Sequence, residues 1–198
     1  MQKLESKTIE QIVSVVISVI LLSVFSTFVQ SSRAEQEPMP VSIASVEAEI
    51  AKKTEEIRLL ELKKFSEQKT AFTDEDLARL LSAVGFEGKA LKTAWAVVKK
   101  ESNGRPLAFN GNTRTGDSSY GIFQINMIGG LGVTRRDKFD LDSNKDLFDP
   151  VVNAQIAYHM SRGGEDFTAW KISAPYTNRD EIRYKEWYAK FPEGVVNE

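Results

Sequence analysis

The chain has 198 residues, of which 41% are hydrophobic and 27% charged, so it can hold one compact domain with attachments but not a large multidomain machine. It has no cysteine and one histidine, which excludes disulfides, a thiolate nucleophile and a Cys/His zinc site. Any catalysis must therefore use carboxylates, hydroxyls or lysine. With 26 basic and 28 acidic residues the net charge is −2, and we expect no nucleic-acid partner.

The N-terminal segment, residues 1–34, is predicted to be a membrane anchor. Residues 12–29 carry no charged side chain and are apolar apart from serine and threonine. A helix of this length spans about 27 Å, close to the thickness of a bilayer core. A cleaved signal peptide is the alternative, because small residues flank Arg33. The apolar run exceeds the usual core of a signal peptide, which favours a retained single-pass anchor.

Residues 35–72 are predicted to form a linker and a helical stalk. Glu35–Pro40 contains two prolines and cannot continue a helix. Beyond it, apolar residues recur at alternating steps of three and four, the spacing of a short coiled coil. These residues are Ile43, Val46, Ile50, Ile57 and Leu60. Self-association of two copies through the stalk and docking of a single helix on its neighbour both stay open.

The remaining residues, 73–198, are expected to form one domain that begins with two helices. Thr73 is a predicted N-cap followed by acidic residues, and Gly85 ends the first helix. In the second helix, over residues 89–100, apolar residues share one face, and the same step leads to Glu101. Asn103 and the residues after it stop the helix, which places Glu101 in the last turn at the edge of the core.

A carboxylate at this position is disfavoured in its charged form by partial burial and by the negative end of the helix dipole. General-acid cleavage of a glycosidic bond requires a carboxyl group that keeps its proton near neutral pH. Glu101 is therefore a candidate for this role. The alternative is an ordinary surface ion pair of Glu101 with Arg105 or Lys100.

Residues 107–126 are rich in turn formers and short extended pieces, which predicts a small β-hairpin folded over the end of the second helix. This hairpin would bring the amides of Gln124 and Asn126 beside Glu101, where they would suit sugar hydroxyls and N-acetyl groups. The rings of Tyr120 and Phe123 either face sugar rings or belong to the core. The glycine-rich stretch 129–132 predicts a tight bend, because it lacks the lysine of a phosphate loop.

Four segments, in this order, resemble the lysozyme-like lytic transglycosylase family, in its soluble-lytic-transglycosylase type seen in phage virion and tail proteins. They are Lys100–Gly104, Gly116–Asn126, Gly130–Gly132 and Phe148–Ala154. The resemblance implies a mainly α-helical, lysozyme-like α+β fold with a small β-hairpin, here preceded by a transmembrane helix and a helical stalk. It implies peptidoglycan glycan strands as the substrate and neither a cofactor nor a metal.

The resemblance also implies roles for single residues, with Glu101 as the catalytic acid. Asn153 corresponds to an asparagine that faces the sugar groove, and the alternative is that it caps its own helix. The aromatic residues near the end of the domain correspond to those that close the cleft. The predicted substrate-binding residues are Ser102, Asp117, Tyr120, Gly121, Gln124, Asn126, Asn153, Trp170 and Tyr176.

The implied reaction cuts the β-1,4 bond between N-acetylmuramic acid and N-acetylglucosamine, with Glu101 acting as acid and then as base toward the muramoyl 6-hydroxyl. Hydrolysis would instead need a positioned water and a second carboxylate, for which Asp117 is the candidate. A turn-capping role for Asp117 is the alternative. The preferred hypothesis is a membrane-held lytic transglycosylase that opens the wall for phage genome entry. Alternatives are a lysozyme-type hydrolase of a bacterial envelope apparatus and a non-catalytic glycan-binding structural protein.

Three further features are expected to have structural roles. Residues 140–146 have the alternating oxygens of a calcium loop, but Lys145 replaces the turn glycine and Val151 the final glutamate, so no metal is expected. His159 is predicted to be a packed or surface residue of a helix. The charged and aromatic residues of 179–191 predict an amphipathic helix that packs on the domain.

Overall fold

The computed structural model describes residues 43–112, 114, 116–172 and 178–194. The predicted anchor at residues 12–29, the linker Glu35–Pro40 and Tyr176 lie outside this part of the chain. Among the residues that are described, no helix combines the length and the apolar character needed to cross a membrane. Contacts divide the chain into two units, Met1–Ala51 and Lys52–Glu198, and the second unit carries the candidate site.

Helix α2, Ile43–Ser66, occurs where the helical stalk is predicted. Within the second unit, its residues Leu62 and Phe65 are buried in the same core as the helices that follow. Two residues of the predicted apolar seam, Ile57 and Leu60, are 51% and 67% exposed. The face of α2 that carries the seam is therefore distinct from the face that enters the core, and self-association through the seam stays a prediction.

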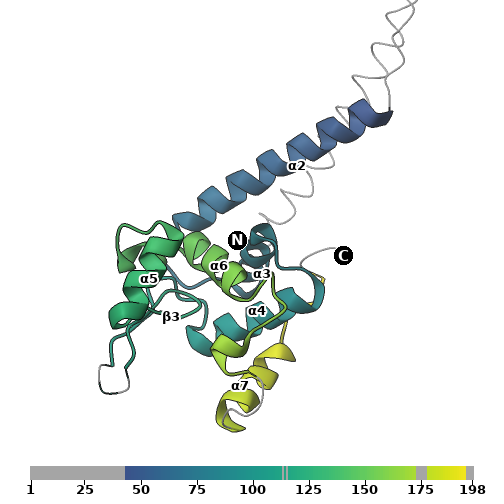
Figure 1. Ribbon diagram of the computed structural model, residues 1–198. Coiled ribbons are helices and arrows are strands. Elements are labelled where there is room, and N and C mark those ends of the chain that lie inside the picture. The colour runs from purple at the N-terminus through teal and green to yellow at the C-terminus, as the bar shows by residue number, and fades with distance from the viewer. Residues whose placement is uncertain (1–42, 113, 115, 173–177, 195–198) are drawn as a thin grey trace, which may run out of the picture. The chain divides into compact units, whose positions relative to one another are not determined.

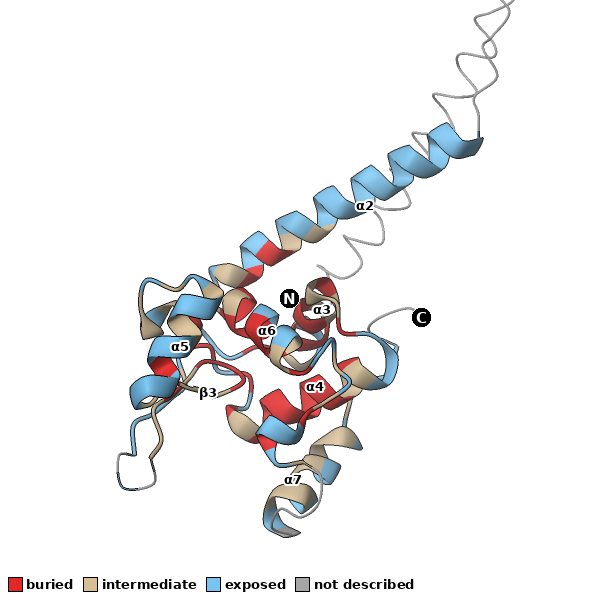
Figure 2. Cartoon of the chain, viewed as in Figure 1, coloured by how far each residue is buried: buried red, intermediate tan, exposed pale blue. Residues whose placement is uncertain are grey.

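Helices α3, Asp74–Val84, and α4, Gly88–Glu101, form the centre of the unit (Figure 1). As predicted, the Thr73 hydroxyl accepts a hydrogen bond from the Asp76 amide at 3.0 Å, and Gly85 ends α3 with φ 119°. Every residue of α4 from Thr93 to Lys100 is buried, which Figure 2 shows as a continuous red stretch. The helical pattern predicts a single buried face for α4; the unbroken apolar run Ala94–Val98 covers all sides of the helix, which explains the difference.

Helix α7, Asn178–Tyr188, packs along α4 and gives α4 its second buried face. The Trp95 ring of α4 makes edge contacts with the rings of Trp187 and Phe191, whose centroids lie 6.2 and 5.7 Å away. The Lys99 ammonium lies over the Trp187 ring at 4.8 Å. The predicted amphipathic helix near the C-terminus is thus confirmed as a packed element of the domain.

A small antiparallel sheet follows α4 in the order β1, β2, β3. The strands are Phe109–Asn110, Ser119–Tyr120 and Ile125–Asn126, with Phe109 opposite Tyr120 and Tyr120 opposite Ile125. The predicted two-stranded hairpin is therefore part of a three-stranded sheet. Strands of two residues make few ladder hydrogen bonds, so other contacts must hold them in place.

Helix α5, Gly129–Phe139, begins at the glycines for which a tight bend was predicted, and this prediction is wrong. The lack of a side chain at Gly132 lets the helix pack on the preceding strand, because a Cβ atom there would overlap the Met127 carbonyl oxygen. The glycines thus serve close packing of a helix start, with Gly129 in a left-handed conformation at φ 50°.

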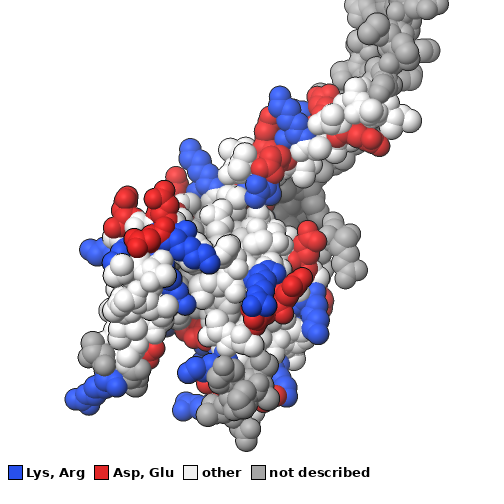
Figure 3. Space-filling view, viewed as in Figure 1, with Lys and Arg blue, Asp and Glu red and all other residues white. Residues whose placement is uncertain are grey.

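Two short 3₁₀ helices and helix α6 complete the core: η2 Asn144–Phe148, α6 Pro150–Met160 and η3 Thr168–Trp170. Asp149 is the N-cap of α6, and its carboxylate accepts the Val151 amide at 2.8 Å. On the face shown in Figure 3, basic and acidic side chains alternate over the surface of the unit.

Candidate active site at the end of helix α4

Glu101 is the last residue of α4, as the sequence pattern predicted. Its side chain is 25% exposed, so it lies at the edge of the core with access to solvent. The next residue, Ser102, closes the helix with its amide bonded to the carbonyls of Val98 and Lys99. Asn103 then turns the chain away in a left-handed conformation at φ 54°.

Glu101 forms an ion pair with its neighbour Lys100, with 2.9 Å between Oε1 and Nζ. The Lys100 side chain is only 4% exposed, and its ammonium also donates to the Trp170 carbonyl at 2.6 Å. The alternative prediction for Glu101 is a surface ion pair with Lys100 or Arg105. The pair with Lys100 exists but is partly buried, whereas the Arg105 Nε donates to the Ser102 carbonyl at 2.9 Å.

The charge balance at Glu101 therefore has a contribution that the sequence pattern did not reveal. The Lys100 ammonium lies 2.9 Å from the Glu101 carboxylate and is itself almost fully buried. The helix pattern gave no sign that a buried cation would lie beside this carboxylate.

Ser102 connects the end of α4 to the sheet and does not face a groove. Its hydroxyl donates to the Ile122 carbonyl at 2.7 Å, and the residue is 2% exposed. Ile122 lies in the turn between β2 and β3, so this bond fixes the turn against the residue next to Glu101. Ser102 is predicted to contact substrate. In the structure its hydroxyl binds the Ile122 carbonyl and so positions the backbone of the turn.

Two other predicted groove residues also bond to backbone groups through their side chains, and a third, Gly121, lies in close contact with its neighbours. The Gln124 Nε2 donates to the carbonyls of Ala108 and Gly121 at 3.1 and 2.9 Å. The Asn126 Oδ1 accepts the amides of Ser118 and Ile128 at 3.3 and 3.0 Å. A Cβ atom at Gly121, where φ is 74°, would overlap both the Leu147 carbonyl oxygen and the Asn153 amide.

Asn126 has two further partners. Its Nδ2 donates to the Gly116 carbonyl at 3.2 Å, and its backbone carbonyl accepts from the guanidinium of Arg135 on α5. Burial lowers the pKa of Arg135 from its ordinary value. This bond ties strand β3 to α5. The polar residue predicted to follow the groove segment therefore joins two elements of the structure.

Asn153 is fully buried, with an exposure of 0%. Its Oδ1 accepts the Phe123 amide at 2.9 Å, and its Nδ2 donates to the carbonyls of Tyr120 and Leu147 at 2.9 and 3.0 Å. Neither prediction for Asn153 matches this position, because the side chain does not face a groove and Asp149, not Asn153, caps the helix. Asn153 instead holds the sheet and η2 to α6.

Trp170 lies in the core rather than across a cleft, with an exposure of 5%. Its Nε1 donates to the Phe123 carbonyl at 2.8 Å, and its ring packs against those of Phe123 and Phe167. Its own carbonyl accepts the Lys100 ammonium. Trp170 thus contributes to the site through its backbone, while Tyr176 lies outside the residues that the structure describes.

Tyr120 is half-buried between the rings of Phe109 and Phe148, whose centroids lie 4.8 and 5.4 Å away. Phe109, which the sequence pattern did not indicate as a site residue, is 55% exposed. Its ring is tilted by 48° against the Tyr120 ring, and an exposed aromatic ring of this kind offers an apolar face to a sugar. Phe109 lies in a segment rich in turn formers, outside any helical pattern. This position is the sequence signal that could have identified it as an exposed ring near the site.

Asp117 lies in the connection between β1 and β2, and its amide donates to the Asn112 carbonyl at 3.0 Å. This bond closes the loop, as expected of a turn residue. The structure thus provides a turn position for Asp117, and its role as a second carboxylate stays a prediction.

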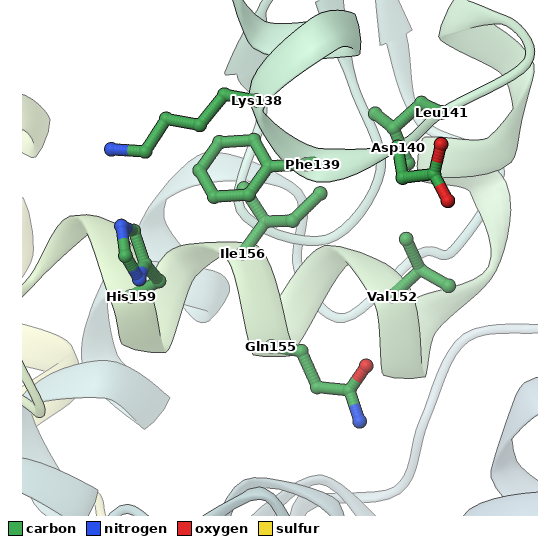
Figure 4. Close-up of a pocket in the computed structure, with 8 residues that line it drawn as sticks. All are labelled: Lys138, Phe139, Asp140, Leu141, Val152, Gln155, Ile156 and His159. Carbon is green, nitrogen blue, oxygen red and sulfur yellow. The ribbon is translucent and has the colours of Figure 1, made fainter.

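A pocket of about 410 Å³ lies between the C-terminal end of α5 and helix α6 (Figure 4). Phe139 and Ile156 line its apolar part, and the sole histidine, His159, lies at its edge with its ring 5.3 Å from that of Phe139. Asp140, from the rejected calcium pattern, is the left-handed C-cap of α5. Of the predicted substrate-binding residues that the structure describes, none lines this pocket.

Comparisons with known proteins support a lysozyme-like fold. Residues 78–172 match the family model described as a lysozyme like domain. The milk isozyme of lysozyme C from Canis lupus familiaris is 41% identical over 58 residues, which cover 28% of this chain and 45% of the lysozyme. The chain therefore spans less than half the length of the curated relative it matches. No solved structure matches the chain.

The matched residues and the mainly helical architecture with a small three-stranded sheet give this unit a lysozyme-like fold, as predicted. The match begins within α3 and ends just after η3, so it includes Glu101, the sheet and Trp170. Glu101 is thus a partly exposed carboxyl group at a helix end within the matched region.

Proposed function

We propose that the domain cleaves the glycan strands of peptidoglycan, with Glu101 as its acid and base. The observation that supports this most is the position of Glu101, which is partly exposed at the end of α4 and held by Lys100 at 2.9 Å. The turn between β2 and β3 is fixed beside it through Ser102. A single carboxyl group that gives and then takes a proton is sufficient for this chemistry.

The bond cleaved is the β-1,4 linkage between N-acetylmuramic acid and N-acetylglucosamine. Glu101 protonates the leaving oxygen and then accepts the proton of the muramoyl 6-hydroxyl, which attacks the same sugar and leaves a 1,6-anhydro end. This lytic transglycosylase reaction needs one carboxyl group. A lysozyme-type hydrolase is the second candidate, and it is favoured only if Asp117 supplies the second carboxylate.

The test is digestion of purified sacculi by the fragment that begins at Lys52. We expect Glu101→Gln to lower the rate of muropeptide release at least about 100-fold, because an amide cannot give up a proton to the leaving oxygen. Glutamine keeps an oxygen that can accept from Lys100, so the fold should persist. Mass spectrometry of the products distinguishes anhydro ends from reducing ends.

The matched control is Glu87→Gln at the opposite end of the same helix, where Glu87 is the N-cap residue but makes no side-chain cap bond. It should release muropeptides like the wild type. Equal rates for Glu101→Gln and wild type would show that Glu101 is not the acid. Binding of sacculi without turnover by the wild type would favour the non-catalytic, glycan-binding alternative.

We further propose that the chain acts at a membrane, with residues 12–29 as a single-pass anchor, α2 as a stalk that pairs with a second copy, and the domain facing peptidoglycan. A phage particle that opens the wall for genome entry and a bacterial envelope apparatus both need such a tethered enzyme. Membrane fractionation of the full chain against the fragment from Lys52 tests the anchor. Recovery of both in the soluble fraction would refute it.

A further inference from the structure

Lys100 is a buried cation within a helix, and its ammonium has two oxygen partners. They are the Glu101 Oε1 at 2.9 Å and the Trp170 carbonyl at 2.6 Å. An ammonium with 4% exposure is stable only if such partners replace its water. The position of Lys100 and that of the Glu101 carboxylate are therefore fixed together.

One partner of Lys100, Trp170, and the backbone of Lys100 itself are anchored by further hydrogen bonds. Trp170 is fixed from the other side by its Nε1, which donates to the Phe123 carbonyl at 2.8 Å. The backbone carbonyl of Lys100 accepts the Arg183 guanidinium of α7 at 3.0 Å. The groups around the ammonium are thus fixed in position, and the ion pair restricts rotation of the Glu101 carboxylate.

The other nearby cations do not duplicate this role. Arg105 donates to the Ser102 carbonyl and Arg183 to the Lys100 carbonyl, so both bind backbone. Within the described part of the chain, Lys100 is the only cation at ion-pair distance from Glu101. Loss of this one ammonium would free the carboxylate to rotate.

We propose that Lys100 is a positioning residue for Glu101, an inference that rests on the proposed function. Lys100 occupies Oε1 of the carboxylate and leaves Oε2 as the oxygen that exchanges the proton with the substrate. It also fixes the carboxyl plane relative to the 167–170 segment. The orientation of the acid thus depends on a residue that has no contact with the glycan.

The test compares Lys100→Met with Lys100→Arg and with Lys99→Met, a matched control. Lys99 is the adjacent residue of α4, is similarly buried at 9%, and pairs with a different carboxylate, Asp74, at 2.7 Å. We expect Lys100→Met to lower kcat at least about tenfold with KM within about twofold, because the acid loses its orientation but substrate binding does not change. Lys100→Arg should restore most of kcat, and Lys99→Met should leave kcat within about twofold of wild type.

Equal loss of kcat in Lys100→Met and Lys99→Met, each corrected for its folded fraction, would overturn the proposal. A second measurement separates this from failure of the proposed function. The carboxyl ¹³C resonance of Glu101, assigned by its disappearance in Glu101→Gln, should shift in Lys100→Met but not in Lys99→Met. If the wild type releases no muropeptides, the proposed function fails, and an unmoved resonance in Lys100→Met refutes the positioning role independently.

Discussion

Helices α3 and α4 meet through apolar side chains, whereas the three short strands beside them are held by polar side chains that bond to backbone groups. Leu77, Leu80 and Trp95 are completely buried between the helices. In the sheet, Asn153, Asn126 and Gln124 together bond to backbone groups of eight different residues. Strands of two residues lack the ladder that would hold them without this help. Polar residues near a candidate glycan site can therefore be structural.

The helical region should lose the most stability when one large core side chain is removed. Trp95→Ala removes a fully buried ring, its edge contacts with Trp187 and Phe191, and the Nε1 bond to the Asp74 carbonyl at 3.1 Å. We expect the free energy of unfolding to fall by about 3–5 kcal/mol. Urea denaturation followed by circular dichroism measures it, and a fall below about 1 kcal/mol would contradict the assigned core.

The second-largest loss in the free energy of unfolding is expected in the sheet region, where the loss comes from broken hydrogen bonds. Asn153→Leu keeps the branched shape of the side chain but leaves the Phe123 amide and the carbonyls of Tyr120 and Leu147 unpaired in the interior. We expect a loss of about 2–3 kcal/mol in unfolding free energy. Gln155→Leu, on an exposed position of the same helix, should change it by about 0.5 kcal/mol or less. Similar losses in both variants would mean that the buried amide has no special role.

The smallest effect is expected at the half-buried Asn126. Asn126→Ala removes the acceptor of the Ser118 and Ile128 amides and should lower the unfolding free energy by about 1 kcal/mol. Hydrogen exchange should show faster exchange at those two amides and unchanged exchange in α3. The control, Asn110→Ala, removes an exposed bond to the Asn112 amide. Unchanged exchange at Ser118 would show that the strand does not depend on Asn126.

The sequence alone predicts the features that depend on residues close together in the chain. The caps at Thr73 and Gly85, the helical step leading to Glu101, and the left-handed turn at Asn103 are set by neighbours within a few residues. The lysozyme-like fold followed from the order of short motifs, and the family model matches the same region. For these features, local chemistry and global structure agree.

The hydrogen-bond partners of the polar side chains could not be predicted in this way. An asparagine such as Asn153 offers the same donors and acceptors to a sugar or to a backbone, and its choice depends on residues 30 and 33 positions away. The glycines 129–132 are typical of a bend, yet close packing on Met127 uses them in a helix. Lys100 appeared only as a surface partner, because burial of α4 on both sides depends on α7, far along the chain.

The hydrogen bonds of Lys100 and Trp170 also bear on when the site is completed during synthesis. The Lys100 bond joins residues 70 positions apart, and the Trp170 bond to Phe123 joins residues 47 positions apart. Such contacts require long loops to close and form after local helices. A chain emerging from the ribosome thus presents helix α4 with Glu101 long before Trp170 exists to bind Lys100. The carboxyl group is made early, but its orientation is fixed only once most of the domain has been translated.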